Sequence, residues 1–350
     1  MATGESSFTR TYGPLLTMTL DEILSSGAIQ DNVYQANPTL DWFNSGNRIK
    51  VLQGGERIRI PVMTGTNGTF KWYSQLDTLN ITPSLGFTTA WYQWKQAAVS
   101  IAIDGLTVRQ NMGPTQIADI MKEKSRQAEL SLVDGIATGL FSDGTGSSNK
   151  QMTGLEAALP DDPTSDTTYA EINQSDNTSW RSQIQSSVGA AATNLIPKMR
   201  TVWNDCGEGK SGSNSSPDYI VTTQTVHESF EALIAPRVRY EPNPSGGADA
   251  GVEKLLFKGA TVVMDNFCGS GNMYMLNGSH IMLFVHAKAN MAMTEEGFQK
   301  PIDQDALVAQ ILFQGNIAVN NRRKLGKLTG ITLNPISRRY QMAALTHTVD

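Results

Sequence analysis

The stretch from Pro114 to Leu140 constrains the fold more than any other part of the sequence. Its apolar residues recur at steps of three and four, as one face of an α-helix requires, and charged residues take the other faces. Proline suits the first position of a helix. At 1.5 Å per residue the helix is about 40 Å long, so we predict a spine helix. Its apolar positions are Ile117, Ile120, Met121, Ala128, Leu132, Val133, Ile136 and Leu140.

The segment before this helix predicts a long β-hairpin. Apolar residues occupy every second position over 57–62 and again near the end of 87–104, as in strands with one buried face. Asn67-Gly68 is a strong turn signal between them. A two-stranded hairpin is marginally stable alone, so this one needs a neighbouring surface. The aromatic residues in or near it either pack at its base or make contacts elsewhere: Trp72, Tyr73, Trp91, Tyr92 and Trp94.

The remainder of the chain predicts a mixed α and β region with polar loops. One helix is expected over 197–206 and a second over 225–235, with Thr225 and Glu228 forming a capping box. Residues 160–180 are polar and loop-like. Strands are expected over 217–224, 259–265, 272–277, 279–286, 306–320 and 326–332.

Charge and composition exclude several classes of protein. The net charge of −5 argues against general nucleic-acid binding. Two cysteines give neither a disulfide framework nor a metal-binding spacing. No signal peptide is expected, and no apolar run reaches the ~18 residues of a membrane span. Basic residues without acidic neighbours near the C-terminus form either a contact for nucleic acid or an acidic partner, or an ordinary solvated segment: Arg322, Arg323, Lys324, Lys327, Arg338 and Arg339.

Short motifs of enzyme chemistry fail on inspection. The letters GKS around Lys210 match the end of a phosphate-binding loop, but Asn204 stands where its first glycine belongs. A helix, not a strand, is expected before it. His280 and His286 are expected on one strand with even spacing, yet the sequence nominates no further metal ligand. We therefore predict no catalytic, cofactor-binding or metal-binding residues, and a protein that is not an enzyme.

Several stretches in chain order carry a resemblance to a known family. They are 87–113, 118–155, 175–183, 217–233, 255–277 and 305–331. Together they resemble the major capsid proteins of tailed bacteriophages, which have the Hong Kong ninety-seven type fold. Each stretch alone is weakly specific, whereas their common order is fairly specific.

The resemblance implies an α+β fold built from named parts. These are an N-terminal arm at 1–50, an extended β-hairpin loop at 51–104, and the spine helix with the peripheral domain at 105–180. The axial domain would cover 181–293 and 319–334, with 294–318 returning to the peripheral domain and 335–350 forming a C-terminal tail.

The resemblance also implies a function in the virion, after assembly in the host cytoplasm. Copies would assemble through pentamers and hexamers into an icosahedral shell that encloses double-stranded DNA without sequence-specific binding. Portal and decoration proteins are further expected partners, and no binding to a membrane is expected. The extended loop would contact neighbouring subunits through Asn67, Gly68, Phe70, Trp72 and Tyr73.

Two family features and two alternatives remain open. Some members carry an N-terminal scaffolding region, for which about 50 residues are too few, so we expect a separate scaffolding protein or assembly without one. Other members form Lys–Asn crosslinks; Lys71, Lys95, Asn320 and Asn321 are of the right types, but both types are common. The alternatives are an encapsulin-type nanocompartment shell and a monomeric mixed α/β enzyme or binding module.

Overall fold

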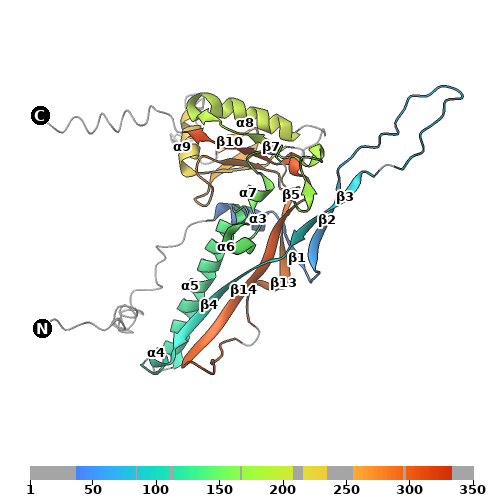
Figure 1. Cartoon of the computed structure of the whole chain (residues 1–350). Helices are drawn as coiled ribbons and strands as arrows, with labels where there is room; N and C mark the ends of the chain where they lie inside the picture. The colour runs from blue at the N-terminus through green and yellow to red at the C-terminus, as the bar shows by residue number, and fades with distance from the viewer. Residues whose placement is uncertain are drawn as a thin grey trace, which may run out of the picture. The chain divides into compact units, whose positions relative to one another are not determined.

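A computed structural model describes residues 37–83, 85–110, 114–165, 168–207, 216–234, 255–294 and 297–332. The chain divides into two compact units. Among the described residues, the first unit holds those within Ala98–Asp134 and Met293–Ile311, and the second holds the others. Helices α5, α8 and α9 and most strands can be followed in Figure 1.

Helix α5 runs over Pro114–Leu140, which confirms the predicted spine helix and both of its ends. Its buried positions Ala128, Leu132, Ile136 and Leu140 follow the predicted stripe, because they recur at four-residue steps on one face. The side chains of Ile117 and Ile120 lie outside the described residues. Met121 and Val133 are only half-buried.

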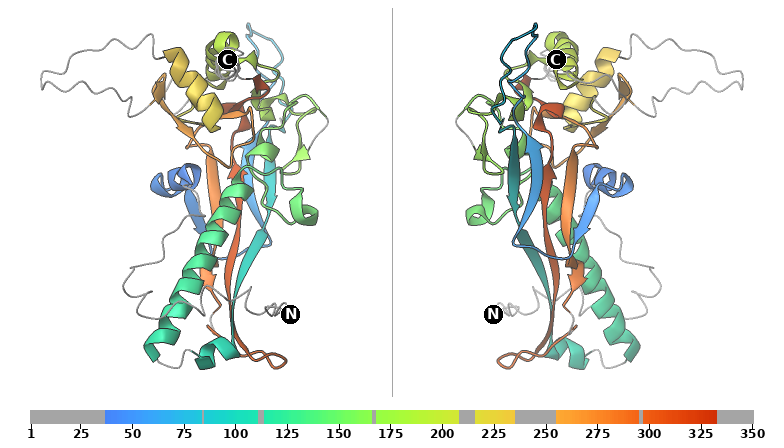
Figure 2. Two further views of the ribbon diagram at one scale, coloured as in Figure 1. Left: turned by 90° about the vertical axis from the view of Figure 1, so that its left-hand side faces the viewer. Right: turned by 90° about the vertical axis from the view of Figure 1, so that its right-hand side faces the viewer.

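A six-stranded mixed sheet forms the core of the second unit. Its order is β10 (Leu255–Phe257), β11 (Ala260–Met264), β9 (Tyr219–Thr222), β12 (Met273–Leu276), β15 (Gly326–Leu328) and β7 (Gln183–Gln185). Helix α8 (Ala191–Gly207) packs on β7 and β15, and α9 (Gln224–Ile234) packs on β11 (Figures 1 and 2). The apolar face of α8 packs into the core beside this sheet, where Met199 and Val202 are fully buried.

Two helix boundaries differ from the prediction. Helix α8 begins at Ala191, six residues before Pro197, and carries this proline within it. Helix α9 begins at Gln224, so Thr225 lies inside the first turn and not before it. The predicted capping box of Thr225 and Glu228 is therefore wrong, because a capping residue must precede the first helical residue. Instead, Gln224 Nε2 donates to Glu228 Oε1 at 2.8 Å.

Helix α3 (Pro38–Ser45) is fastened to the sheet by aromatic and polar contacts. Trp42 stacks on Tyr219 of β9 at 4.7 Å between ring centroids. The buried carboxylate of Asp265 accepts hydrogen bonds from the Thr39 backbone N–H at 3.3 Å and from Thr39 Oγ1 at 2.5 Å. Most of the expected N-terminal arm, residues 1–36, lies outside the described residues.

The remaining sheets are smaller or narrower. Strands β1 (Ile49–Leu52), β13 (Ile281–Met293), β14 (Ala306–Val319) and β4 (Lys95–Asp104) pair in this order. Among the described residues, strands β2 (Arg57–Met63) and β3 (Phe87–Gln93) pair only with each other. The returning strand predicted over 87–104 is thus two strands in two sheets, interrupted at Trp94.

Short elements connect these parts. The pairs β5 (Thr168–Tyr169) with β6 (Ile172–Asn173), and β8 (Gly189–Ala190) with β16 (Ile331–Thr332), form two-stranded sheets. The predicted loop 160–180 therefore contains a small hairpin. The short helices are α4 (Gly105–Gln110), α6 (Gly146–Asn149), α7 (Leu155–Ala158), η1 (Thr178–Trp180) and η3 (Arg322–Lys324).

Candidate assembly surface

The ribbon of β2 and β3 has one buried and one exposed face, as its sequence predicts. The strands pair antiparallel, with Ile58 opposite Tyr92 and Ile60 opposite Ala90. Ile58, Val62, Ala90 and Tyr92 are all at most 8% exposed, which places them on the same inner face. The side chains between them in sequence point to solvent, since a strand alternates its faces. This buried half of the ribbon forms its base.

Polar contacts fix that base to the rest of the second unit. Tyr92 Oη donates to the backbone oxygen of Val319 at 2.7 Å, and its ring lies edge-on to Tyr169. Burial raises the pKa of Tyr92, so the hydroxyl keeps the proton that it donates. The buried amide of Asn316 donates to the backbone oxygen of Gln93 at 2.9 Å. The base therefore has a defined position within the unit.

The ribbon ends at a narrow neck, which is formed by the two facing glycines Gly65 and Gly86. The backbone N–H of Thr64 donates to Gly86 O at 2.9 Å, and Ser179 Oγ donates to Thr64 O at 2.6 Å. A Cβ on Gly86 would lie 2.9 Å from the oxygen of Gly65, closer than real Cβ atoms come. Glycine is thus needed at 86 because the two backbones approach too closely for a side chain.

The chain between Gly65 and Gly86 forms a tip, and hydrogen bonds within this segment close its turns. Asn67 Oδ1 accepts from the backbone N–H of Thr69 at 3.0 Å, and Asn80 Oδ1 accepts from that of Thr82 at the same distance. Asp77 Oδ2 accepts from the backbone N–H of Ser74 at 3.0 Å. Such side-chain-to-backbone bonds define turns where no strand ladder exists.

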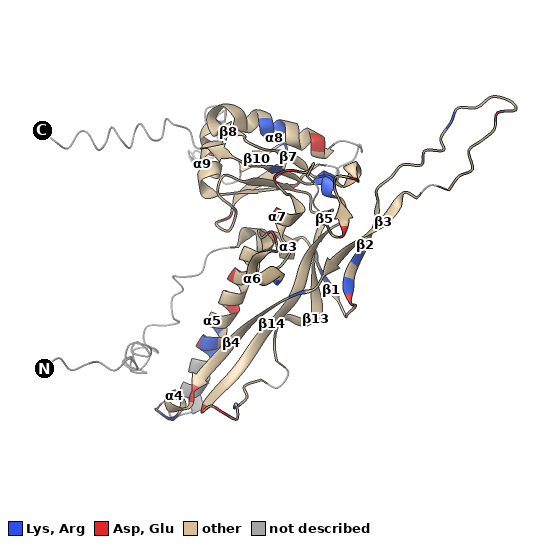
Figure 3. Ribbon diagram, viewed as in Figure 1, with Lys and Arg blue, Asp and Glu red and all other residues tan. Residues whose placement is uncertain are grey.

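The tip exposes apolar side chains to an unusual degree. Phe70 is 77% exposed, Trp72 is 87% exposed and Tyr73 is 69% exposed. Figure 3 shows the tip almost without charge, since Lys71 and Asp77 are its two charged residues. Monomeric proteins rarely expose large contiguous apolar surface unless it binds something. Further exposed apolar residues of the tip and its margin are Leu76, Leu79, Ile81, Leu85 and Phe87.

The structure separates the aromatic residues into two groups. Tyr92 is buried at the base, and Trp94 donates its Nε1 hydrogen to the backbone oxygen of Gly55 at 2.8 Å. Trp72 and Tyr73 lie in the tip, together with the other three predicted contact residues at 67, 68 and 70. All five predicted contact residues thus share one exposed segment.

Three of the basic residues near the C-terminus are buried, so they do not form a contact surface for nucleic acid. Arg322 and Lys327 are fully buried, and Lys324 is 7% exposed. The hypothesis of a basic contact surface is therefore wrong for these three residues. Arg338 and Arg339 lie outside the described residues.

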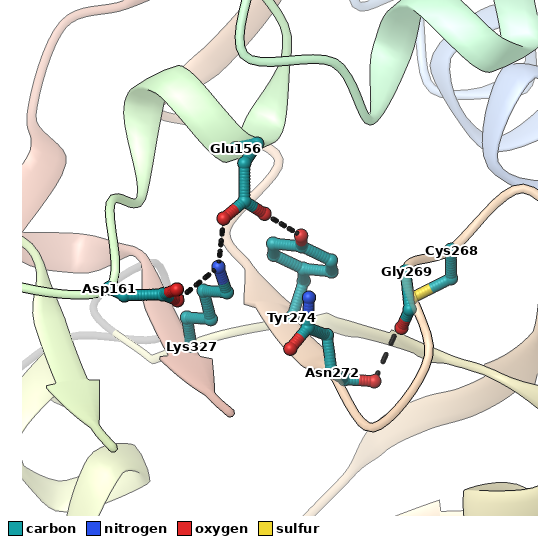
Figure 4. A network of polar contacts seen from close by, with 7 residues as sticks. All are labelled: Glu156, Asp161, Cys268, Gly269, Asn272, Tyr274 and Lys327. Carbon is teal, nitrogen blue, oxygen red and sulfur yellow. Dashed lines mark hydrogen bonds and ion pairs between the residues drawn. The ribbon is translucent and has the colours of Figure 1, made fainter. Parts of the chain in front are cut away.

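The buried amino group of Lys327 lies in a compact polar network (Figure 4). Its Nζ contacts Glu156 Oε1 at 2.5 Å and Asp161 Oδ1 at 2.7 Å. Tyr274, opposite Lys327 in the sheet, donates from Oη to Glu156 Oε2 at 2.5 Å. The network fastens helix α7 to the sheet, and the side chain of Lys327 has no exposed surface.

The two histidines near β13 lie on different elements, and the residues of the phosphate-loop motif around Lys210 are not described. His280 lies in the turn before β13, not on the strand with His286, and its Nδ1 contacts Asn320 Oδ1 at 2.8 Å. The expectation of one strand carrying both is wrong. Nowhere in the described part of the chain do three His, Cys, Asp or Glu side chains gather so as to hold a metal ion. Lys210 lies outside the described residues.

None of the helices within the described ranges combines the length and the apolar character that a membrane crossing demands.

No protein-family profile and no curated protein matches the sequence. Solved structures do match. The cyanophage A-1(L) capsid asymmetric unit has a TM-score of 0.64 at 15% identity, over 87% of this chain and 95% of that chain.

Two further structures match over nearly their full length. The capsid of the native GTA particle has a TM-score of 0.55 at 11% identity, over 94% of this chain and 100% of that one. The holo-SrpI encapsulin complex from Synechococcus elongatus has a TM-score of 0.55 at 9% identity, over 95% and 96%. At such identities the likeness concerns the fold alone. The chain has the fold of tailed-phage capsid proteins, as the sequence resemblance predicted.

Proposed function

We propose that this chain is a major capsid protein, whose copies assemble through pentamers and hexamers into an icosahedral shell around viral double-stranded DNA. The observation that carries the proposal is the exposed apolar tip on a fold that capsid and encapsulin shells share. A shell protein needs such a surface on every copy, because each copy meets the next through unlike patches that close into rings. An enzymatic role has no comparable support.

The tip docks on a neighbouring copy in this proposal. Phe70, Trp72 and Tyr73 are the anchors, and Asn67 and Gly68 hold the turn that presents them. Burying a large apolar side chain stabilises an interface by roughly 1.5–3 kcal/mol. Large exposed aromatic residues are also the type most enriched among the residues that dominate binding energy.

The test is assembly of the expressed protein, followed by sedimentation and electron microscopy. The wild-type chain should form closed particles. Trp72→Ser should reduce particle formation at least tenfold, because about 2 kcal/mol is lost at each tip contact. Leu256→Ser is the matched control, since Leu256 is 56% exposed but lies outside the tip. A stable 38 kDa monomer under all assembly conditions would argue for a monomeric enzyme or binding module instead.

An encapsulin-type shell is the second candidate, since an encapsulin complex shares the fold. The content of the particles separates the two: DNA in particles from the native source supports the capsid, and enclosed protein cargo supports the nanocompartment.

The proposed capsid protein also implies partners and a place. We infer a separate scaffolding protein, a portal and decoration proteins, with assembly in the host cytoplasm and residence in the virion. Uniform, well-formed shells from the chain expressed alone would show that no scaffolding protein is needed. Boiled particles that migrate as monomers on a denaturing gel would rule out covalent crosslinks.

A further inference from the structure

Asparagine is followed by glycine twice in the sequence, at Asn67-Gly68 and at Asn277-Gly278. Such a pair can react with itself, because the backbone nitrogen of the glycine can attack the side-chain amide carbon of the asparagine. Glycine favours this reaction, since it has no Cβ to crowd the attacking nitrogen. How each pair is held in the folded chain decides whether the reaction can proceed.

The surroundings of Asn67 leave the reaction open. Asn67 and Gly68 are both exposed, and a Cβ added at Gly68 would have open space around it. Among the described residues, no acceptor binds the N–H of Gly68. Asn67 Oδ1 accepts from the backbone N–H of Thr69 at 3.0 Å and from Thr69 Oγ1 at 2.7 Å. Two donors on this oxygen stabilise the negative charge that it gains during the attack.

The surroundings of Asn277 hold the second pair in place. Asn277 is 2% exposed, and its Nδ2, which would have to leave, donates to the backbone oxygen of Ser216 at 3.0 Å. The backbone N–H of Gly278 donates to Asp218 Oδ1 at 2.8 Å. A reaction at Asn277 therefore requires this region to open first, whereas Asn67 needs no such opening.

We propose that Asn67 is a site of spontaneous modification, at which it loses ammonia and becomes aspartate or isoaspartate. The Gly68 nitrogen loses its proton to solvent and bonds to Cγ of Asn67, while the bond from Cγ to Nδ2 breaks. The leaving nitrogen takes up a proton from water and departs as ammonia, and the product is a cyclic imide. Water then adds to either carbonyl carbon of the imide and opens the ring. No oxidant or reductant takes part.

The product brings a new charge into the tip. Its carboxyl group is ionised at neutral pH, and isoaspartate also lengthens the backbone within the turn. The cation of the tip, Lys71, already pairs with Asp77 at 3.8 Å. A docked tip is buried on a neighbouring copy, where an unpaired charge is unfavourable. Unassembled subunits therefore lose the ability to dock as they age; this consequence, unlike the reaction itself, rests on the proposed function.

A second asparagine of the tip is a matched control. Asn80 is exposed, and its Oδ1 accepts from the backbone N–H of Thr82 at 3.0 Å and from Thr82 Oγ1 at 2.6 Å. The surroundings of its side-chain oxygen thus match those of Asn67, but Ile81 follows it in place of glycine. The branched Cβ of isoleucine crowds the backbone nitrogen that would attack. Asn80 should therefore react much more slowly.

The test is incubation of the unassembled full-length chain at mildly alkaline pH, followed by digestion at acidic pH and mass spectrometry. The measured quantity is conversion of each asparagine to aspartate or isoaspartate. Conversion at Asn67 should be at least about tenfold faster than at Asn80 and Asn277, since a small difference in barrier already gives this factor. Gly68→Ala places a Cβ in open space and should slow conversion at Asn67 by about tenfold or more.

Equal rates at Asn67 and Asn80, or an unchanged rate in Gly68→Ala, would overturn the proposal. The consequence for assembly is measured separately, by comparing the particle yield of each chain before and after incubation. The yield of the wild type should fall as Asn67 is converted, and Gly68→Ala should retain its own initial yield. An undiminished yield from converted wild-type chain would contradict docking through this turn and leave the modification itself standing.

Discussion

Replacing Lys327 with methionine tests whether the network under the sheet holds helix α7 in place. Lys327 has no exposed side-chain surface and contacts two carboxylates, Glu156 and Asp161. Methionine keeps the length and the apolar stem but removes the charge. Glu156 then keeps only the hydroxyl of Tyr274 as a partner from this network.

The magnitude follows from how exposed each partner is. Removing one member of a buried ion pair costs about 3–5 kcal/mol. The carboxylate of Asp161 is 63% exposed, so water screens its share to at most about 1 kcal/mol. That of Glu156 is 29% exposed and carries most of the effect. We expect a loss of about 3 kcal/mol, or roughly 150-fold in the unfolding equilibrium.

Urea unfolding of the unassembled full-length chain measures this loss. The matched control is Lys300→Met, since Lys300 pairs with Asp305 but is 66% exposed; it should change stability by less than about 0.5 kcal/mol. Adding Glu156→Gln to Lys327→Met should cost less than the sum of the single changes, because the carboxylate has already lost its partner. A loss under about 1 kcal/mol, or strict additivity, would refute the reasoning.

Three further predictions concern other parts of the second unit. Gly154→Ala should destabilise the chain by about 1–3 kcal/mol, because its Cβ would lie 2.4 Å from a backbone oxygen of α5; Gly135→Ala, with open space around it, should not. Burial raises the pKa of Tyr219 to about 12 from 10.0, so its contribution to stability is complete below pH 10 and lost as the pH rises through 12. Urea midpoints of Tyr219→Phe should therefore fall less steeply across that window than those of the wild type. Thr39→Val should cost about 1–2 kcal/mol in the same assay by removing a donor to the buried carboxylate of Asp265, and an unchanged midpoint would contradict that role.

The elements that the sequence predicts well are those determined by local pattern. Helix α5 is one, because proline at its start and the apolar stripe along it both lie within the stretch itself. Strand β2 is another. The break at Trp94 could not be predicted, because the flanking segments both read as strand, and only the pairing partner differs. Partners come from distant parts of the chain, β2 for one strand and β14 for the other.

The buried cations show a second limit. Arg and Lys are almost never fully buried unless they are paired, so a cluster such as RRKLGK reads as surface. Lys327 is buried because Glu156 and Asp161 meet it from a segment more than 160 residues earlier. Arg322 is buried with hydrogen-bond partners at Ala158 and Gln174, which lie 164 and 148 residues earlier in the chain. No signal near these residues in the sequence marks those partners. Within the tip, the residues themselves predicted only the turn at Asn67-Gly68, and the contact residues were implied by the resemblance.

The hydrogen bonds that close the turns of the tip decide whether its backbone is ordered when the chain folds or when the tip docks. Holding one residue in a single backbone conformation costs about 1–2 kcal/mol, and a tip without internal bonds would meet that cost on docking. Here Asn67, Asp77 and Asn80 hold the turns within the subunit itself. The cost falls on folding, and docking has only to immobilise side chains. In the proposed shell, a growing edge would therefore select arriving subunits by the fit of a shape already formed.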